Sequence, residues 1–203
     1  MREIVSGVFT WSRFSEPHGY DFNGYLVRDP AGNVCIDPVA PEPDDLAVLA
    51  AFGVHDIVLT NRNHVRAANA VREATGARCS IHAEDAAYAR QQGATIDAVL
   101  HAGAHLGPLV VVAVPGKSPG EIALHWPERS ILIVGDALIG NPPGHCTLLR
   151  EKVLDDPARL RASVETLLAL EFDTLLVGDG VSVLGGAHGR VAELVATFPT
   201  AGA

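Results

Sequence analysis

Basic residues are scarce in this sequence, which has 15 Lys and Arg against 24 Asp and Glu and a formal net charge of −9 at pH 7. Proteins that bind nucleic acid through its phosphates carry the opposite sign of charge. The sequence also lacks an apolar run approaching the roughly 18 residues of a membrane-spanning helix, and its first residues do not form the apolar core of a signal peptide. We therefore expect a cytoplasmic protein with no nucleic-acid partner and no contact with a membrane.

Cysteine is rare as well. The three cysteines, Cys35, Cys79 and Cys146, are scattered along the chain and form no Cys-x-x-Cys pair. Cys35 and Cys79 each lie in an apolar run that is typical of a strand. We expect all three to be buried thiols in a reducing compartment.

Apolar residues, in contrast, make up 48% of the 203 residues, and charged residues make up 19%. A chain of this length buries roughly 70% of the surface that its unfolded form exposes. We expect a single domain over residues 1–203 whose stability requires neither a disulfide nor a structural metal.

Apolar periodicity and the positions of glycine and proline predict a mixed α/β chain that begins with a strand meander. The expected strands are residues 3–10, 23–28, 33–37, 57–59, 79–82, 96–100, 109–114, 121–126, 131–134 and 175–177. The expected helices are residues 43–52, 65–75, 84–91, a segment that begins near 157, and 189–198. Sheets in the interior with helices on both outer faces fit this order best.

Polar residues concentrate at the ends of four predicted strands, where a rigid strand positions a loop side chain that solvent and ligands can reach. These loops are residues 60–64 (Thr-Asn-Arg-Asn-His), 115–120 (Pro-Gly-Lys-Ser-Pro-Gly), 135–136 (Gly-Asp) and 178–180 (Gly-Asp-Gly).

In order and spacing, these four loops resemble the motifs THxHxDH, PGHTPG, GD and GHG of the metallo-β-lactamase superfamily. The Pro-Gly-x-Ser-Pro-Gly match is the specific one, because two prolines and two glycines fix an unusual loop. The resemblance covers essentially the whole chain. It implies a four-layer αββα sandwich and the hydrolysis of esters, amides, thioesters or phosphodiesters with one or two zinc or iron ions.

The sequence departs from this family at its metal-binding positions. Lys117 stands where the third motif has histidine, and Asp179 stands where the last motif has histidine. The first motif is shorter and aligns in two ways. One alignment puts Asn63 on the family's aspartate and His64 on its second-metal histidine; the other puts Asn61 and Asn63 on two metal-binding histidines and Arg66 on the last. We prefer the first, because a deletion in a loop costs less than a shifted helix.

The two alignments agree that the HxH pair is absent. Neutral asparagine amides are poor zinc ligands, and a protonated lysine has no lone pair to offer. The sequence therefore predicts that the dinuclear metal site has been lost and that the protein works without a metal cofactor. The alternative is a mononuclear site for one zinc, iron or manganese ion, with His64, Asp136 and Asp179 as ligands.

Without cations, the aspartates at this edge of the sheet would repel each other. We therefore expect the Lys117 ammonium to lie between Asp136 and Asp179 in place of the metal's charge, with Arg62 or Arg66 supplying more positive charge. Lys117, Asp136, Asp179 and His64 are the candidate catalytic residues. Each also has an ordinary structural interpretation, such as a solvated loop lysine or a helix-start histidine.

The candidate substrate-binding residues are Asn61, Asn63, Arg66 and His145. His145 lies in the stiff loop that follows Asp136, where the family places substrate contacts. A nucleophile pair of His145 and Cys146 is disfavoured, because neighbouring residues in an extended loop point apart. His188 lies too far beyond the last strand to replace Asp179. The aromatic segment of residues 11–22 is core or pocket wall.

The sequence leaves three functions open. The first is a protein with a hydrolase fold that binds or processes a small anionic or carbonyl-containing molecule in this cleft without zinc. The second is a mononuclear metal-dependent hydrolase that uses His64, Asp136 and Asp179. The third is a non-enzymatic scaffold, which a resemblance in fold cannot exclude. In each case the protein is a candidate homo-oligomer.

Overall fold

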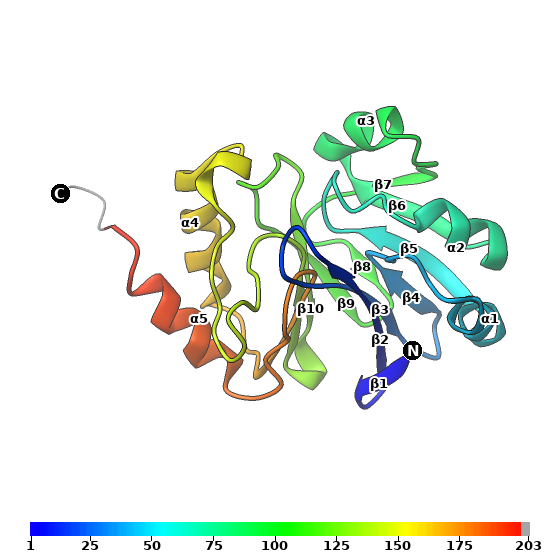
Figure 1. The fold of residues 1–203 in the computed structure, drawn as a ribbon, viewed down its shortest axis with the longest axis horizontal. Coiled ribbons are helices and arrows are strands. Elements are labelled where there is room, and N and C mark those ends of the chain that lie inside the picture. The colour runs from blue at the N-terminus through cyan, green and yellow to red at the C-terminus, as the bar shows by residue number, and fades with distance from the viewer. Residues whose placement is uncertain (200–203) are drawn as a thin grey trace.

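A computed structural model describes residues 1–199 and contains two β-sheets and five α-helices (Figure 1). The last four residues of the expected domain lie outside the described part. The first sheet has seven strands in the order β1 to β7: β1 Arg2–Val5, β2 Val8–Ser15, β3 Tyr20–Val27, β4 Asn33–Ile36, β5 Val54–Leu59, β6 Arg78–His82 and β7 Ala98–Leu100. The second has the order β12-β11-β10-β9-β8: β8 His105–Leu106, β9 Leu109–Ala113, β10 Ile122–Trp126, β11 Ile131–Val134 and β12 Thr174–Val177.

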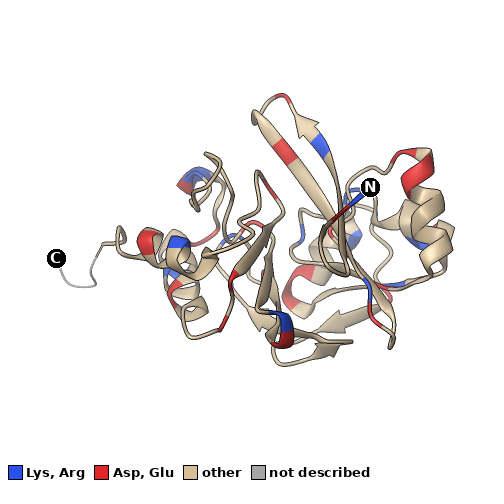
Figure 2. Ribbon diagram, turned by 90° about the horizontal axis from the view of Figure 1, so that it is seen from below, with Lys and Arg blue, Asp and Glu red and all other residues tan. Residues whose placement is uncertain are grey.

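The two sheets pack face to face, because residues of both form one buried cluster that includes Val58 of β5 and Leu124 of β10. Helices cover the two outer faces: α1 Pro43–Phe52, α2 Ala68–Thr75 and α3 Ala83–Gln91 on the first sheet, and α4 Pro157–Leu167 and α5 Ala187–Val195 on the second. Two short 3-10 helices, Pro127–Arg129 and Glu151–Val153, complete the elements. This is the expected αββα sandwich, and acidic residues occur on helices of both outer layers (Figure 2).

Local sequence signals explain most element ends. Gly53 ends α1 in the left-handed conformation that favours glycine, and Asp156 caps α4 by accepting a hydrogen bond from the Arg159 N–H. The expected strand 3–10 is instead a hairpin, because Gly7 has a φ of 76° and reverses the chain between β1 and β2. The helix expected from residue 65 begins at Ala68, since residues 61–67 form a loop. Strand β8 was not predicted.

The polar loops meet at one edge of the sandwich, where backbone hydrogen bonds join the two sheets. The Ile122 N–H of β10 donates to the Thr60 carbonyl at 2.9 Å, and the Asn23 N–H of β3 donates to the Gly178 carbonyl at 2.8 Å. The Asn23 side-chain amide donates to the carbonyls of Val177 and Gly180, at 2.9 Å each. These bonds hold the end of β5 against β10 and the end of β12 against β3, although the paired segments are far apart in the sequence.

Asp85 of α3 holds two of these loops in place. Its buried carboxylate accepts hydrogen bonds from the Arg62 N–H at 2.9 Å, the Ser118 hydroxyl at 2.5 Å and the Gly120 N–H at 3.0 Å. A Cβ atom on Gly120 would lie 2.8 Å from this side chain, so glycine is required there. Asp85 therefore connects the loop that carries His64 to the loop that carries Lys117.

Replacing Asp85 with alanine should lower the free energy of unfolding by about 3 kcal/mol, because two buried donors and one part-buried donor lose their charged acceptor. Urea denaturation followed by circular dichroism measures this change. Glu84→Ala is the matched control, because Glu84 is the exposed neighbour on the same helix and should change stability by less than about 1 kcal/mol. Equal effects of the two substitutions would show that Asp85 does not connect the loops.

The three cysteines are buried and unpaired, in agreement with the sequence-based expectation of buried thiols. Among the helices of residues 1–199, none combines the length and the apolar character that crossing a bilayer requires.

Candidate active site

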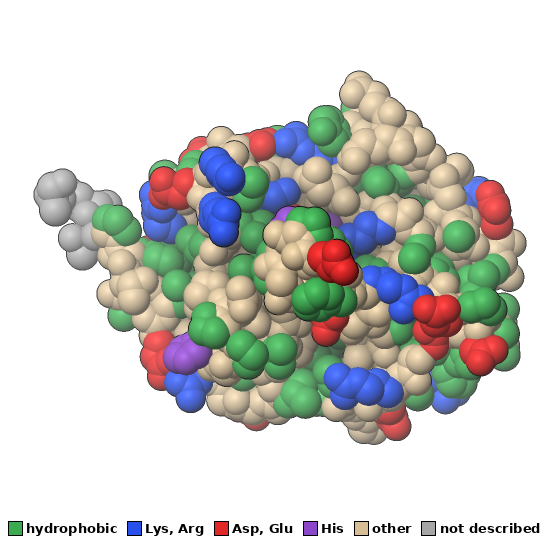
Figure 3. Space-filling model, viewed as in Figure 1, with side chains coloured by type: hydrophobic (Ala, Val, Ile, Leu, Met, Phe, Trp, Pro, Cys, Tyr) green, Lys and Arg blue, Asp and Glu red, His purple; other side chains and the backbone are tan. Residues whose placement is uncertain are grey.

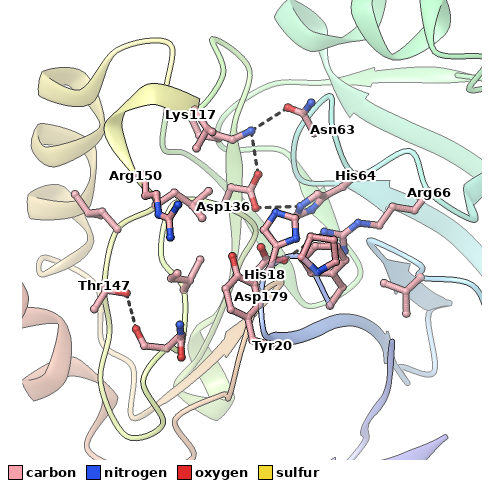
Figure 4. A pocket seen from close by; sticks show the side chains of 18 of the residues that line it. His18, Tyr20, Asn63, His64, Arg66, Lys117, Asp136, Thr147, Arg150 and Asp179 are labelled. Atoms are coloured by element: carbon pink, nitrogen blue, oxygen red, sulfur yellow. Dashed lines mark hydrogen bonds and ion pairs between the residues drawn. The ribbon is translucent and has the colours of Figure 1, made fainter. Parts of the chain in front are cut away.

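The loops at this edge enclose a cavity of about 960 Å³, which is lined by residues of β2 and β3, by the loops that follow strands of both sheets and by the segment after Asp136 (Figure 4). His64, Lys117, Asp136 and Asp179, the four candidate catalytic residues, all line it. The structure thus brings together side chains from four separate loops. Asn63 and Arg66, two of the candidate substrate-binding residues, also lie on its wall.

His64 is buried between two carboxylates. Its Nδ1 lies 2.8 Å from Asp37 Oδ2, and its Nε2 lies 3.1 Å from Asp136 Oδ1. Burial and the Arg66 charge lower the pKa of His64, but Asp37 and Asp136 outweigh them and raise it to about 10. In this arrangement both ring nitrogens carry a proton and donate to carboxylate oxygens.

Asp37 fixes the position of this histidine. It follows β4 with a φ of 46°, and its carboxylate accepts hydrogen bonds from the Thr60 N–H at 2.8 Å and the Thr60 hydroxyl at 2.5 Å. The Asp37 side chain is 2% exposed. A carboxylate that holds the far nitrogen of a histidine sets the orientation of the ring and makes the other nitrogen a better ligand.

Lys117 lies against Asp136. Its Nζ is 3.1 Å from Asp136 Oδ2 and donates to Asn63 Oδ1 at 2.9 Å. Burial raises the pKa of Asp136, but the His64 and Lys117 charges outweigh it and hold that pKa below its usual range. Asp136 is therefore an ionised carboxylate between two cations.

Asp179 pairs with Arg66 instead of Lys117, so the expected position of Lys117 between the two aspartates is wrong. Arg66 Nη2 lies 3.3 Å from Asp179 Oδ1, and the guanidinium stacks on the Phe22 ring at 4.6 Å. Phe22 and Asp179 form a β-bridge, which places this pair at the junction of the two sheets. Burial and Asp136 raise the pKa of Asp179, against the opposing charges of His64 and Arg66.

His64, Asp136 and Asp179 could hold a metal ion. All three are buried, and each offers a ligand atom within 4.8 Å of the other two. One imidazole and two carboxylates form a donor set that suits zinc, iron or manganese. The residues present therefore fit one divalent cation at this position.

Three sequence-based candidates lie away from the cavity. Asn61 is fully buried beneath it, where its oxygen accepts the Asn63 N–H at 2.8 Å, so its expected role in substrate binding is not supported. His145 is exposed outside the cavity wall, because the chain turns and presents Thr147 instead. Arg62 pairs with Asp155 at 2.7 Å rather than with Asp136 or Asp179. His188 lies against the Leu168 carbonyl at 3.0 Å, away from the site, as expected.

Three residues of the site, Asp37, Glu121 and Arg150, were not predicted from the sequence. Asp37 is the last residue of the predicted strand 33–37, and a carboxylate at the end of a strand is a signal that could have identified it. Glu121 is buried behind Asp136 and accepts the Asp136 N–H at 2.7 Å; burial and the Asp136 charge raise its pKa well above the usual range. Tyr20 belongs to the aromatic segment that was expected to be core or pocket wall, and it lines the cavity; burial and Asp179 raise its pKa to about 12. Arg150 lines the opposite wall, and no sequence signal distinguishes it.

Comparisons with known proteins agree with this fold. A family model described as the metallo-beta-lactamase superfamily matches residues 4–198. A hydroxyacylglutathione hydrolase from Fuscovulum blasticum is 33% identical over 161 residues, which cover 75% of this chain and 59% of that protein. A second hydroxyacylglutathione hydrolase, from Anaeromyxobacter dehalogenans, is 34% identical over 152 residues, which cover 72% of this chain and 55% of that protein. The chain spans 55–61% of the length of the curated relatives it matches.

Solved structures show the same architecture. A protein determined in a di-iron-bound form superposes with a TM-score of 0.69 and 27% identity, over 89% of this chain and 98% of that one. The metallo-β-lactamase FIM-1 from Pseudomonas aeruginosa, in its mono-zinc form, has a TM-score of 0.74 over 97% and 95% of the two chains; at 20% identity it shows the fold alone. The chain belongs to the metallo-β-lactamase superfamily.

Proposed function

We propose that this protein is a hydrolase that uses a single divalent cation held by His64, Asp136 and Asp179. The observation that carries the proposal is the buried set of three ligand atoms within 4.8 Å of one another on the cavity wall. The curated relatives are named as hydrolases, and solved relatives are described with di-iron and mono-zinc sites. Within this proposal the dinuclear site is lost, since asparagine and lysine stand at the other metal-binding positions.

Bound at these residues, the cation would supply a Lewis acid and a water of lowered pKa. The protein's own side chains prepare the site for it. His64 must lose the proton on Nε2 that now faces Asp136, while the proton on Nδ1 stays in its hydrogen bond to Asp37. Arg66 and Lys117 offset the carboxylate charge before the cation arrives.

The cavity wall favours an anionic acyl substrate. Five of its residues are basic, namely Arg13, Arg66, Lys117, Arg150 and Lys152, and two are acidic, Asp136 and Asp179, although the chain as a whole carries a net charge of −9. Near the centre of the face in Figure 3, a histidine side chain is visible between basic side chains. A hydroxyacylglutathione thioester, the substrate class in the relatives' names, is the first compound to test.

The decisive experiment is a metal titration. After treatment with a chelator, the protein should bind one zinc, iron(II) or manganese ion per chain, measured by calorimetry and elemental analysis. Hydrolysis of the thioester should rise in proportion to the bound ion. Asp179→Asn should weaken the binding at least tenfold, because a neutral amide replaces a charged ligand. Asp173→Asn, an exposed aspartate four residues before the end of β12, should leave binding unchanged.

Two ions per chain, or full activity in excess chelator, would contradict the proposal. The second outcome points to the other candidate function, a cleft that binds or processes an anionic small molecule without metal. The observation in its favour is that Lys117 already pairs with Asp136 and Arg66 with Asp179. In that case the anion should bind equally well with and without chelator.

A further inference from the structure

Lys117 offsets the charge of Asp136 in the proposed cation site, and it also lines the cavity that would hold the substrate. Building on the proposed function, we propose that Lys117 is a catalytic residue whose ammonium takes the place of a second cation. In this role it donates a hydrogen bond to the substrate oxygen that becomes negative during hydrolysis.

The contacts of the ammonium leave one donor for the substrate. A lysine ammonium has three N–H donors. Within residues 1–199, two oxygens lie within bonding distance of Nζ: Asn63 Oδ1 at 2.9 Å and Asp136 Oδ2 at 3.1 Å. Lys117 lines the cavity, and the residue is only 8% exposed. The third N–H is therefore available to a ligand in the cavity.

The loop around Lys117 fixes this ammonium in place. A Cβ atom on Gly116 would lie 2.4 Å from the backbone of Leu160, so the loop packs directly on α4. Ser118 is bound to Asp85 at 2.5 Å, and the Gly116 carbonyl accepts the Asp156 N–H at 2.8 Å. Donors that are fixed before the reaction stabilise developing charge without reorganisation.

The charges around the ammonium fit a replacement for a cation. Asn63 accepts its hydrogen bond without adding a negative charge, and Asp136 is the carboxylate in contact with it. Lys117 thus shares Asp136 with the proposed cation site, as a second positive centre would. The chain has only two lysines, and both line this cavity.

In the proposed step, the oxygen of water forms a bond to the acyl carbon, and the carbonyl electron pair moves onto the carbonyl oxygen. Lys117 donates a hydrogen bond to this oxygen and keeps its proton. When the pair returns, the bond from the acyl carbon to sulfur or oxygen breaks, and the leaving group takes up a proton from solvent. The attacking water releases one proton to solvent, so the protons balance.

Lys117→Met tests the proposal, because methionine keeps the length and removes the charge. At saturating metal, kcat for the thioester should fall about 100-fold or more, as on loss of one oxyanion donor. The affinity for the single cation should rise, since a competing positive charge leaves Asp136. Arg159→Met on the exposed face of α4 is the charge-matched control and should leave both values unchanged.

Chemical rescue of a second variant tests the same role if Lys117→Met folds poorly. Lys117→Ala leaves space for an amine, so ethylammonium should raise the kcat of this variant at least tenfold. Tetramethylammonium, which has no N–H, should leave the kcat of the variant unchanged. Unchanged kcat in Lys117→Met, or no rescue in a folded Lys117→Ala, would overturn the role of Lys117. A wild-type protein that binds no metal, or that stays inactive when loaded, would instead overturn the proposed function.

Discussion

Replacing Asp37 with asparagine should weaken the affinity for the single cation about 10- to 100-fold and flatten the pH dependence of stability. Asp37 is outside the proposed ligand set, and it acts by holding His64 Nδ1 at 2.8 Å. Loss of such a carboxylate typically costs 10- to 100-fold in metal affinity. Asparagine tolerates the positive φ of this position, so the backbone should keep its conformation.

The effect on stability follows from the pKa of His64. In the folded protein without metal, this pKa is raised from 6.5 to about 10. Below pH 6.5 the histidine is protonated in both the folded and the unfolded state, so its ion pairs contribute fully to the free energy of unfolding. As the pH rises from 6.5 to about 10, the unfolded state loses this proton first, and the free energy of unfolding should fall by roughly 3 to 5 kcal/mol.

In Asp37→Asn, the fall in stability over this range should be much smaller, because one of the two carboxylates that raise the pKa of His64 is gone. Urea denaturation of the chelator-treated protein at several pH values measures it, and calorimetry measures the metal affinity. Asp44→Asn, an exposed aspartate in the first turn of α1, is the matched control. A variant with the stability profile and metal affinity of the wild type would show that Asp37 does not act through His64.

Much of the fold could be predicted from the sequence, because its signals are local. Helix α1 begins and ends where Pro43 and Gly53 predict, and α4 begins at Pro157, where the sequence predicts it. The hairpin at Gly7 was missed, since a glycine inside an apolar run has the same pattern as a continuous strand. The start of α2 was placed too early for a related reason: residues 65–67 have helix-forming side chains, but the chain forms the loop of the site there.

The candidate site was predictable in its members but not in its pairing. The four loop motifs identified His64, Lys117, Asp136 and Asp179, and the structure places all four on one cavity. Which cation pairs with which carboxylate depends on side-chain directions that spacing does not determine. Arg66 reaches Asp179 because it stacks on Phe22, a residue more than forty positions earlier in the chain.

The residues that line the cavity were harder to predict than the four candidate catalytic residues. Asn61 and Asn63 are two positions apart on the same loop, and yet one is buried beneath the site while the other binds Lys117. Arg150 lies in a segment whose path depends on bridges between Ile139 and Thr147 and between Gly140 and Gly180. Contacts between residues this distant leave no periodic pattern in a single sequence.

Replacing Gly116 with alanine should destabilise the protein by about 3 kcal/mol or more and displace Lys117. The φ of Gly116 is 144°, a conformation that residues with a side chain rarely adopt. In addition, the new Cβ atom would lie 2.4 Å from the Cα, Cβ and N atoms of Leu160. Leu160 lies on the buried face of α4, so neither the helix nor the loop at Gly116 can move aside without a large cost in stability.

Gly189→Ala is the matched control, with an expected effect of the opposite sign. Gly189 lies inside α5, and a Cβ atom there meets nothing within 4 Å, so alanine should stabilise the helix by about 0.5 to 1 kcal/mol. Urea denaturation of both variants gives the two free energies, and a metal titration of Gly116→Ala reports on the site. If Gly116→Ala were as stable as Gly189→Ala, the loop could move away from α4, and the ammonium of Lys117 would not be held in the position from which it acts.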